Sequence, residues 1–217
     1  MNDVGAAEHT GGSTRDDILG VVLAGGKSRR MQTDKAMLVG RSGLPLTLQA
    51  AVTLGGVVNR VAISGRSDRW VRERLRAARD EATAAPIPSC FALPDPPAFE
   101  GYGPLAGLLA AMEAANRLHC ESILVMPVDM PDILPQSLRL LIAPRDAVAT
   151  VAKTDRVQPL VARYATDLAS GLKDALKQQQ RSVHRWLASV EHVEVDLGDR
   201  VGINLNHPHE YEHWHRS

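Results

Sequence analysis

Apolar runs of strand length alternate along this chain with segments whose apolar residues recur at helical spacing. Residues 18–23 form the first such run, and their continuous apolar, β-branched character predicts a strand that is buried on both faces. Alternation of strands with helices is typical of an α/β protein with a largely parallel central sheet. The pattern therefore predicts that fold class.

The other elements follow from the same pattern. We predict strands at residues 60–64, 91–93, 122–126, 147–151, 160–164 and 192–197. The last run alternates cleanly between apolar and polar residues, which is typical of an edge strand. We predict helices at residues 45–54, 68–80, 105–116, 136–143, 166–178 and 182–189, and a solvent-exposed helix in the His-rich tail. Residues 81–89 are a predicted loop, and so are residues 94–103, which are rich in Pro and Gly.

Composition narrows the class of protein. Hydrophobic residues make up 44% and charged residues 23% of the 217 residues, as in ordinary globular proteins. Lys plus Arg and Asp plus Glu both number 25, so the formal net charge is zero. A general binder of nucleic acid or of anionic membranes carries a surplus of positive charge. We therefore expect neither partner, and we expect Cys90 and Cys120 to be reduced thiols without a metal.

The ends of the chain carry no targeting signal that we can identify. Residues 1–16 are polar and lack the apolar core of a signal peptide, so we expect a disordered tail. No apolar run approaches the ~20 residues that a membrane-spanning helix needs. The four histidines of the C-terminal tail do not converge with a carboxylate-rich motif, and we expect no metal site there. These observations predict a cytoplasmic protein.

The stretch GVVLAGGKSRRMQTDK at residues 20–35 raises the question of phosphate binding. A P-loop needs a glycine five positions before the Gly of Gly-Lys-Ser, but that position is Val21, inside the predicted strand. A dinucleotide-binding fingerprint needs three spaced glycines, and only the adjacent pair Gly25 and Gly26 is present. The stretch is neither motif.

A different kind of phosphate site remains compatible with this stretch. Ala24, Gly25 and Gly26 let the backbone turn at the carboxyl end of the first strand, where ligands of open α/β sheets bind. Main-chain N–H groups exposed by such a turn suit phosphate oxygens. Cationic side chains follow the turn, at Lys27, Arg29, Arg30 and Lys35. From the residues alone, a tight turn followed by a solvated basic loop is the alternative.

The stretch LAGGKSRRMQTDK resembles the signature L-A-G-G-x-S-x-R-M-G-x-D-K of MobA-like nucleotidyltransferases, and most closely the molybdenum cofactor guanylyltransferase branch. Later segments also match, in the expected order: GPLAG at 103–107, PVDMP at 127–131, QPLVARY at 158–164, RSVHRWL at 181–187 and INLNHP at 203–208. Together they extend the resemblance from residue 18 to about residue 214. Gln32 departs from the signature, because the family usually has Gly there.

The resemblance implies a Rossmann-like, three-layer fold of the glycosyltransferase-A type. It implies one nucleotidyltransferase domain over residues 17–217, with a nucleotide-binding N-terminal half and a cofactor-binding C-terminal half. The implied reaction transfers GMP from GTP to the molybdenum–molybdopterin cofactor and releases pyrophosphate, with Mg²⁺ as the metal. GTP and the molybdopterin cofactor are the implied substrates, and molybdoenzyme delivery proteins are implied transient partners.

The resemblance also implies roles for individual residues. The catalytic residues are Arg30, Lys35 and Asp129, of which Asp129 is the Mg²⁺ ligand. The nucleotide-binding residues are Leu23, Ala24, Gly25, Gly26, Lys35, Ser64, Asp95, Gly103, Pro104, Leu105 and Asp129. The cofactor-binding residues are Arg181, Ser182, Asn204 and Asn206, with Arg163 as a weaker candidate.

Two other functions stay open on sequence. The sibling cytidylyltransferases run the same chemistry with CTP, although Leu23 to Gly26 resemble the guanylyl branch, whereas the cytidylyl branch tends to have Thr-Ala-Ala-Gly. A degenerate nucleotide-binding protein without turnover is the alternative from a different class, and Gln32 makes it conceivable.

Overall fold

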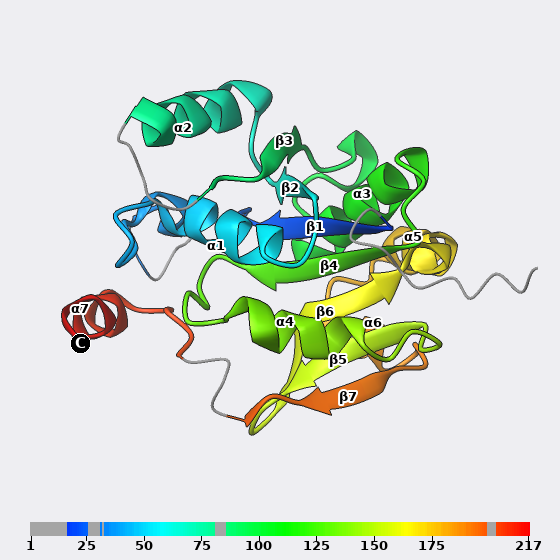
Figure 1. The fold of residues 1–217 in the computed structure, drawn as a ribbon. Helices are drawn as coiled ribbons and strands as arrows, with labels where there is room; N and C mark the ends of the chain where they lie inside the picture. The colour runs from blue at the N-terminus through cyan, green and yellow to red at the C-terminus, as the bar shows by residue number, and fades with distance from the viewer. Residues whose placement is uncertain (1–16, 26–30, 32, 81–85, 199–202) are drawn as a thin grey trace, which may run out of the picture.

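The computed structural model describes residues 17–25, 31, 33–80, 86–198 and 203–217. In this part of the chain, one sheet of seven strands runs in the order β3-β2-β1-β4-β6-β5-β7 (Figure 1). The strands are β1 (Ile18–Leu23), β2 (Arg60–Ser64), β3 (Ser89–Leu93), β4 (Ser122–Pro127), β5 (Ala149–Lys153), β6 (Val157–Ala165) and β7 (Val193–Asp196). Strand β6 is antiparallel to β4 and β5, whereas the other neighbours are parallel. The predicted α/β class with a mostly parallel sheet is confirmed.

Strand boundaries follow the prediction closely at the N-terminal end of the chain and less closely beyond it. Strands β1 and β2 have the predicted bounds, and β7 lies at the sheet edge as predicted. Strand β5 lies two residues later than predicted, and β6 begins three residues earlier. The reason is their mutual pairing, which continues past an irregularity after Val151 until Lys153 faces Val157.

The helices are α1 (Leu46–Gly55), α2 (Asp68–Asp80), α3 (Pro104–Arg117), α4 (Pro135–Ile142), α5 (Ala169–Lys177), α6 (Val183–Leu187) and α7 (Pro208–Arg216). Helices α3, α4 and α7 begin on a proline, whose missing N–H is harmless in a first turn. Short 3₁₀ turns occur at η1 (Lys35–Met37), η2 (Pro97–Phe99) and η3 (Thr166–Leu168). The predicted loop at 94–103 therefore contains one turn of helix, and the predicted helix at 166–178 is divided.

Helices cover both faces of the sheet (Figure 1). Ile18 and Val22 of β1 belong to a core cluster that includes residues of α1, α2 and α4. Leu19, Val21 and Leu23, which alternate with them, belong to a second cluster with α3, α5 and α6. Alternate residues of one strand thus contribute to two cores, as expected for a strand buried on both faces. The predicted three-layer arrangement is confirmed.

The C-terminal helix α7 is partly buried, although sequence predicted an exposed helix. Trp214 is 2% exposed, and its indole N–H donates to Asp132 Oδ1 at 2.7 Å. The guanidinium of Arg41 lies 4.6 Å from the centre of the Trp214 ring. Tyr211 also packs against the core, and its hydroxyl donates to Val39 O at 2.8 Å. These two aromatic side chains anchor a helix that is otherwise rich in charged residues and histidines.

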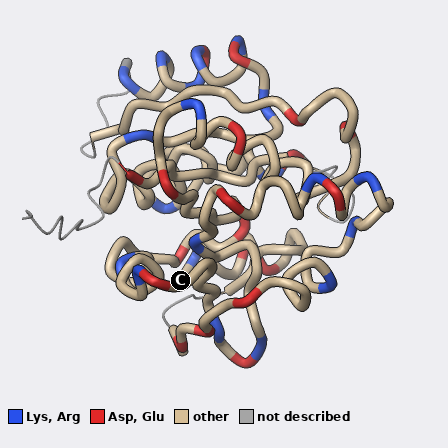
Figure 2. Tube along the Cα trace, turned by 90° about the vertical axis from the view of Figure 1, so that its right-hand side faces the viewer, with Lys and Arg blue, Asp and Glu red and all other residues tan. Residues whose placement is uncertain are grey.

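Lys, Arg, Asp and Glu residues are spread along the whole trace (Figure 2). Helix α2, whose sequence is DRWVRERLRAARD, has five arginines with three acidic residues among them. Among the described residues, no helix is long and apolar enough to cross a membrane.

Strand register brings four carboxyl ends together at one edge of the sheet. Leu23 of β1 pairs with Ser64 of β2 and with Pro127 of β4, and Ser64 pairs with Leu93 of β3. Strand β6 runs the other way and therefore begins at this same edge. The loops that leave β1, β2, β3 and β4, and the start of β6, consequently surround one space.

Candidate functional site

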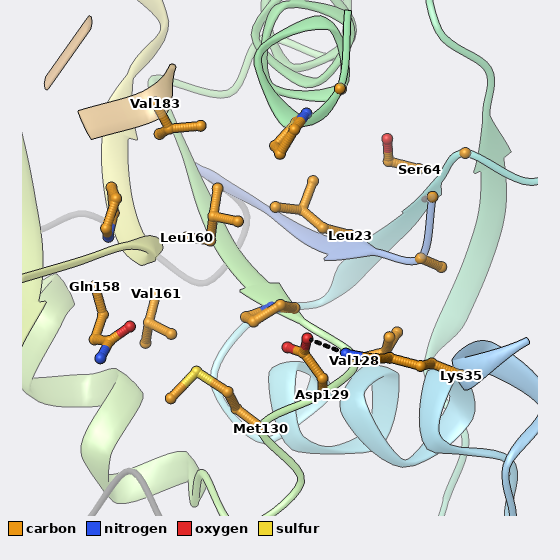
Figure 3. Close-up of a pocket in the computed structure, with 18 of the residues that line it drawn as sticks. Leu23, Lys35, Ser64, Val128, Asp129, Met130, Gln158, Leu160, Val161 and Val183 are labelled. Atoms are coloured by element: carbon orange, nitrogen blue, oxygen red, sulfur yellow. Dashed lines mark hydrogen bonds and ion pairs between the residues drawn. The ribbon is translucent and has the colours of Figure 1, made fainter. Parts of the chain in front are cut away.

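A cleft of about 1420 Å³ opens at this edge of the sheet. It is lined by residues 23–25, 34–36, 64–65, 95, 100–101, 103–104, 107, 127–130, 156–161, 183–184 and 204. Figure 3 shows Leu23, Ser64, Lys35 and Asp129 on one side of it and Gln158, Leu160 and Val183 on the other. The position agrees with the general rule that open α/β sheets bind ligands beyond the carboxyl ends of their strands.

The turns after β1 and β2 touch through two glycines. Gly65 has φ +78°, and a Cβ built on it would lie 2.4 Å from Gly25 Cα and 2.7 Å from Gly25 N. The backbone N–H of Ala24 donates to Ser64 O at 3.1 Å. Gly65 must therefore lack a side chain for the turns to approach this closely, and a Cβ on Gly25 would be a tight 3.3 Å from Gly65 Cα.

Lys35 and Asp129 meet at the base of the cleft (Figure 3). Lys35 Nζ lies 3.0 Å from Asp129 Oδ2 and 3.0 Å from Asn206 Oδ1. The two side chains of the ion pair are 14% and 22% exposed. Asp129 is also held through its backbone, because its carbonyl accepts from Leu205 N at 2.7 Å. Three segments that are distant in sequence thus supply a cation, a carboxylate and an amide.

A second ion pair lies beside the first turn. Asp34 accepts from both terminal nitrogens of Arg66, at 2.7 and 2.5 Å, and Arg66 Nε donates to Ala24 O at 3.1 Å. Asp34 also caps η1, since its Oδ1 accepts from Ala36 N at 3.2 Å. This carboxylate therefore fixes the start of the turn that carries Lys35.

Two carboxylates lie on the rim formed by the loop after β3. Asp95 and Glu100 both line the cleft. Burial raises the pKa of the Asp95 carboxyl above its ordinary value, and the charge of Glu100 raises it further. Ionisation of Asp95 is thus disfavoured in the fold.

The start of α3 forms another part of the wall. Gly103 and Pro104 line the cleft, and Gly103 has φ +74°. A Cβ on Gly107 would lie 2.7 Å from Ser64 Oγ, so this helix packs closely on β2. Leu105 was predicted to bind nucleotide, but it is fully buried and does not line the cleft. Its side chain is part of the core beneath α3.

The opposite side of the cleft is formed by the beginning of β6 and of α6. Arg156, Gln158 and His184 are its polar side chains among apolar ones. Gln158 Nε2 donates to Thr154 Oγ1 at 3.3 Å. We did not assign residues 156–161 to a site from sequence, because an apolar run does not reveal that its strand runs antiparallel. The QPLVARY match was the available signal.

The four predicted cofactor-binding residues are separated in the structure. Asn204 lines the cleft, and its buried Oδ1 has no hydrogen-bond partner among the described residues. Asn206 contacts Lys35 and thus lies with the predicted nucleotide residues. Ser182 caps α6 by accepting from Arg185 N at 3.3 Å. Arg181 lies over the Tyr102 ring, 4.4 Å from its centre, and neither Arg181 nor Ser182 lines the cleft.

Arg163, the weaker candidate, has a structural place. It is 7% exposed, and its Nη2 donates to the carbonyls of Pro144 and Ala147 at 2.8 and 2.5 Å. These contacts hold the connection between α4 and β5. Gly26, Arg30 and Gln32 lie outside the described residues, as do Lys27 and Arg29.

The two side-chain oxygens that accept from Lys35 are of the kind that binds a magnesium ion together with phosphate. Mg²⁺ is usually held by one or two carboxylates, with substrate phosphates and water completing its octahedron. Asp129 and Asn206 supply a carboxylate and an amide oxygen around one ammonium group. Within the described residues, no cluster of three or more His, Cys, Asp or Glu could hold a metal ion.

Known proteins resemble this chain in sequence and in fold. Residues 20–195 match the family described as the MobA-like NTP transferase domain. The chain is 32% identical over 205 residues to a molybdenum cofactor guanylyltransferase of Burkholderia vietnamiensis. The aligned region covers 89% of this chain and 93% of that protein.

Solved structures extend the likeness to the fold. Molybdopterin-guanine dinucleotide biosynthesis protein A from Archaeoglobus fulgidus is 21% identical with a TM-score of 0.68, and 91% and 97% of the two chains are covered. A Mycobacterium tuberculosis protein solved as a complex with manganese is 18% identical with a TM-score of 0.59, and 92% and 98% are covered. At these identities the structural likeness shows the fold alone.

Proposed function

Because this chain belongs to the family of MobA-like NTP transferase domains, we propose that it transfers GMP from GTP to the molybdenum–molybdopterin cofactor and releases pyrophosphate. Its place in the family makes it a nucleotidyltransferase. The observation that carries the finer proposal is the cleft in which Lys35 and Asp129 meet beside the turn of β1. The relative from Burkholderia vietnamiensis, named a guanylyltransferase, supports the choice of GTP.

The reaction requires alignment and charge more than covalent help from the protein. A terminal phosphate oxygen of the cofactor attacks the α-phosphorus of GTP, and the bond from that phosphorus to the bridging oxygen breaks as pyrophosphate leaves. Negative charge gathers on the non-bridging and leaving oxygens, so fixed cations and N–H donors stabilise the transition state. Holding both reactants in one cleft supplies the alignment.

The nucleotide side of the cleft has the groups that the triphosphate needs. We assign the backbone turn at Ala24 and Gly25 to the phosphates, and Lys35, with Arg30, to their charge. We assign Ser64, Asp95, Gly103 and Pro104 to the nucleoside. Leu105 would act only by supporting this wall, because its side chain is buried.

Asp129 and Asn206 would hold a magnesium ion that arrives with the triphosphate. When bound, the ion neutralises charge on the phosphate oxygens. The manganese complex of the Mycobacterium tuberculosis protein supports use of a divalent cation by this fold. In the present structure Lys35 neutralises Asp129.

The opposite side of the cleft is the place for the acceptor. Arg156 and His184 offer donors for its phosphate, and the apolar residues between them suit the flat pterin ring. Asn204 presents a buried oxygen that has no hydrogen-bond partner within the described part of the chain, and an N–H group of the pterin would satisfy it. Contact with molybdoenzyme delivery proteins stays a prediction of the resemblance.

The test measures nucleotide binding and turnover together. Melting temperature is recorded with GTP, CTP, ATP or UTP and Mg²⁺, since a ligand that binds only the folded state stabilises it by mass action. We expect the largest increase with GTP, and pyrophosphate release on addition of the cofactor. A larger increase with CTP would assign the chain to the cytidylyl branch. Binding of GTP without pyrophosphate release would identify a degenerate nucleotide-binding protein.

A further inference from the structure

Arg66 links two segments of the nucleotide side, although its own side chain does not line the cleft. It follows β2 by two residues and is 16% exposed. Its Nε donates to the carbonyl of Ala24, and its terminal nitrogens donate to both oxygens of Asp34. The guanidinium also lies 5.0 Å from the centre of the Trp70 ring. One planar cation therefore contacts three separate parts of the chain.

We propose that Arg66 is a positioning residue for nucleotide binding, which fixes the separation between Ala24 and Asp34. Both residues line the cleft, Ala24 at the turn after β1 and Asp34 beside Lys35. The inference rests on the proposed function, because it takes Ala24 and Lys35 to contact the triphosphate. Asp34 extends the effect to Lys35, since the same carboxylate caps η1.

The physical reason is conformational entropy. Two parts of a binding wall that are already held at a fixed separation lose less freedom when a ligand binds across them, so more of the interaction energy appears as affinity. Arginine suits this role because its rigid fork donates several hydrogen bonds in one plane, whereas a lysine ammonium is a point charge on a flexible stem.

Charge gives a second reason. Asp34 lines the cleft, where an uncompensated carboxylate would repel a triphosphate. The two bonds from Arg66 offset that charge, and the same carboxylate is also held by Ala36 N of η1. Arg66 thus acts on the ligand through Ala24 and Asp34, not by contact.

The experiment compares Arg66→Ala and Arg66→Lys with Arg69→Ala, a control that also removes one arginine. Arg69 lies on α2 with a side chain 86% exposed, and it pairs with Glu73. Affinity for Mg²⁺·GTP and for Mg²⁺·tripolyphosphate is measured by calorimetry, and kcat and KM by pyrophosphate release. Assays are run well below the melting temperature of each variant.

We expect Arg66→Ala to weaken both affinities and to raise KM for GTP about tenfold, with kcat changed by less than about threefold. Arg66→Lys should lie between wild type and Arg66→Ala, because one ammonium cannot bond Ala24 and both oxygens of Asp34. Arg69→Ala should match wild type. If Arg66→Ala does not fold, Arg66→Lys gives the same comparison at smaller amplitude.

Asp34→Asn and the double variant Asp34→Asn/Arg66→Lys close a cycle around the pair. If Arg66 acts through Asp34, the two changes are not additive: the double variant loses less affinity than the sum of the losses in the two single variants. Wild-type affinities in Arg66→Lys, additive effects, or a lower melting temperature with unchanged KM would each overturn the proposal. A wild-type protein that binds tripolyphosphate but no GTP contradicts the proposed function alone, and the tripolyphosphate affinities still decide the role of Arg66.

Discussion

The two sides of the cleft are built by different means. On the nucleotide side, backbone turns touch through Gly25 and Gly65, and charged side chains are paired, as in Lys35 with Asp129. On the acceptor side, side chains from β6 and α6 form the wall, and Gln158 makes one long bond to Thr154. The first side is set by close backbone packing and the second by side-chain shape. We therefore expect small changes on the nucleotide side to cause large losses of affinity or turnover, and changes on the acceptor side to cause smaller losses.

The largest effect is expected at Asp129, the carboxylate that pairs with Lys35 on the nucleotide side. Asp129→Asn keeps the size and one oxygen but removes the charge that offsets Lys35 and that Mg²⁺ needs. We expect kcat to fall by about 10³-fold or more, in line with the loss of a principal electrostatic group. Pyrophosphate release across a range of Mg²⁺ concentrations measures it.

Asp132→Asn is the matched control for this change. Asp132 lies in the same loop but outside the lining of the cleft, and its oxygen accepts from the Trp214 indole, a bond that Asn can still accept. It should retain nearly normal turnover. An Asp129 variant with the wild-type rate and wild-type Mg²⁺ dependence would remove Asp129 from the active site.

The next prediction tests whether the backbone contact between the two turns makes GTP binding sensitive to small changes on this side. Gly65→Ala would place a Cβ 2.4 Å from Gly25 Cα, so one of the two turns must shift. We expect GTP affinity to fall about tenfold or more, because the turn that we propose to face the phosphates moves. Calorimetry with Mg²⁺·GTP measures it.

Gly43→Ala separates this clash from backbone strain. Gly43 has φ +80°, close to the +78° of Gly65, but a Cβ there meets nothing within 4 Å. It should lower stability by about 1–2 kcal/mol and leave GTP affinity unchanged. Equal losses of affinity in both variants would show that strain, and not the contact between the turns, governs the site.

A smaller effect is expected on the acceptor side. Gln158→Ala removes a polar side chain from the lining without changing the backbone pairing of β6 with β5. We expect KM for the molybdopterin cofactor to rise about threefold, the equivalent of one modest hydrogen bond, with KM for GTP unchanged. Thr154→Val, which removes the partner of Gln158 outside the cleft, is the control. A rise in KM for GTP instead would mean that the two sides are not separate.

The sequence was sufficient for the elements that place the nucleotide side. The strands β1 and β2 are continuous apolar runs, and a parallel sheet brings their carboxyl ends to the same edge as Asp129. Their residues could therefore be named before the structure was known. That Lys35 and Asp129, 94 residues apart, meet in an ion pair depends on how η1 folds back over the sheet. No local pattern contains that information.

Other parts of the site could not be predicted for definite reasons. The apolar run of β6 is the same whether the strand is parallel or antiparallel, and only its reversed direction places Gln158 in the cleft. The resemblance implies a cofactor role for Asn206, and only the fold shows that its side chain contacts Lys35. Leu105 has the sequence context of a binding motif but points into the core. Long-range packing decides all three.

The smallest effect on stability is expected at Asp95, on the rim of the nucleotide side, and its size depends on pH. The folded pKa of this carboxyl is raised by burial and by Glu100, so the fold disfavours its ionised form. Above the folded pKa the ionised group therefore costs stability, and below the unfolded pKa near 3.8 that cost is absent. Asp95→Asn should raise the melting temperature by about 1–3 °C at pH 7, and this gain should disappear as the pH falls toward 4.

The same variant shows whether Asp95 serves the nucleotide. The ionised carboxylate of Asp95 costs stability in the fold, and a residue that costs stability is expected to have a role in ligand binding. Asp95→Asn should then bind GTP several-fold more weakly while it melts at a higher temperature. Glu100→Gln, which removes the neighbouring charge but leaves Asp95 in place, should give a smaller stabilisation and no loss of GTP affinity. A stabilised Asp95 variant with unchanged affinity would make Asp95 a turn residue, and the nucleotide side would then end at the strand edge formed by Leu23, Ser64 and Pro127.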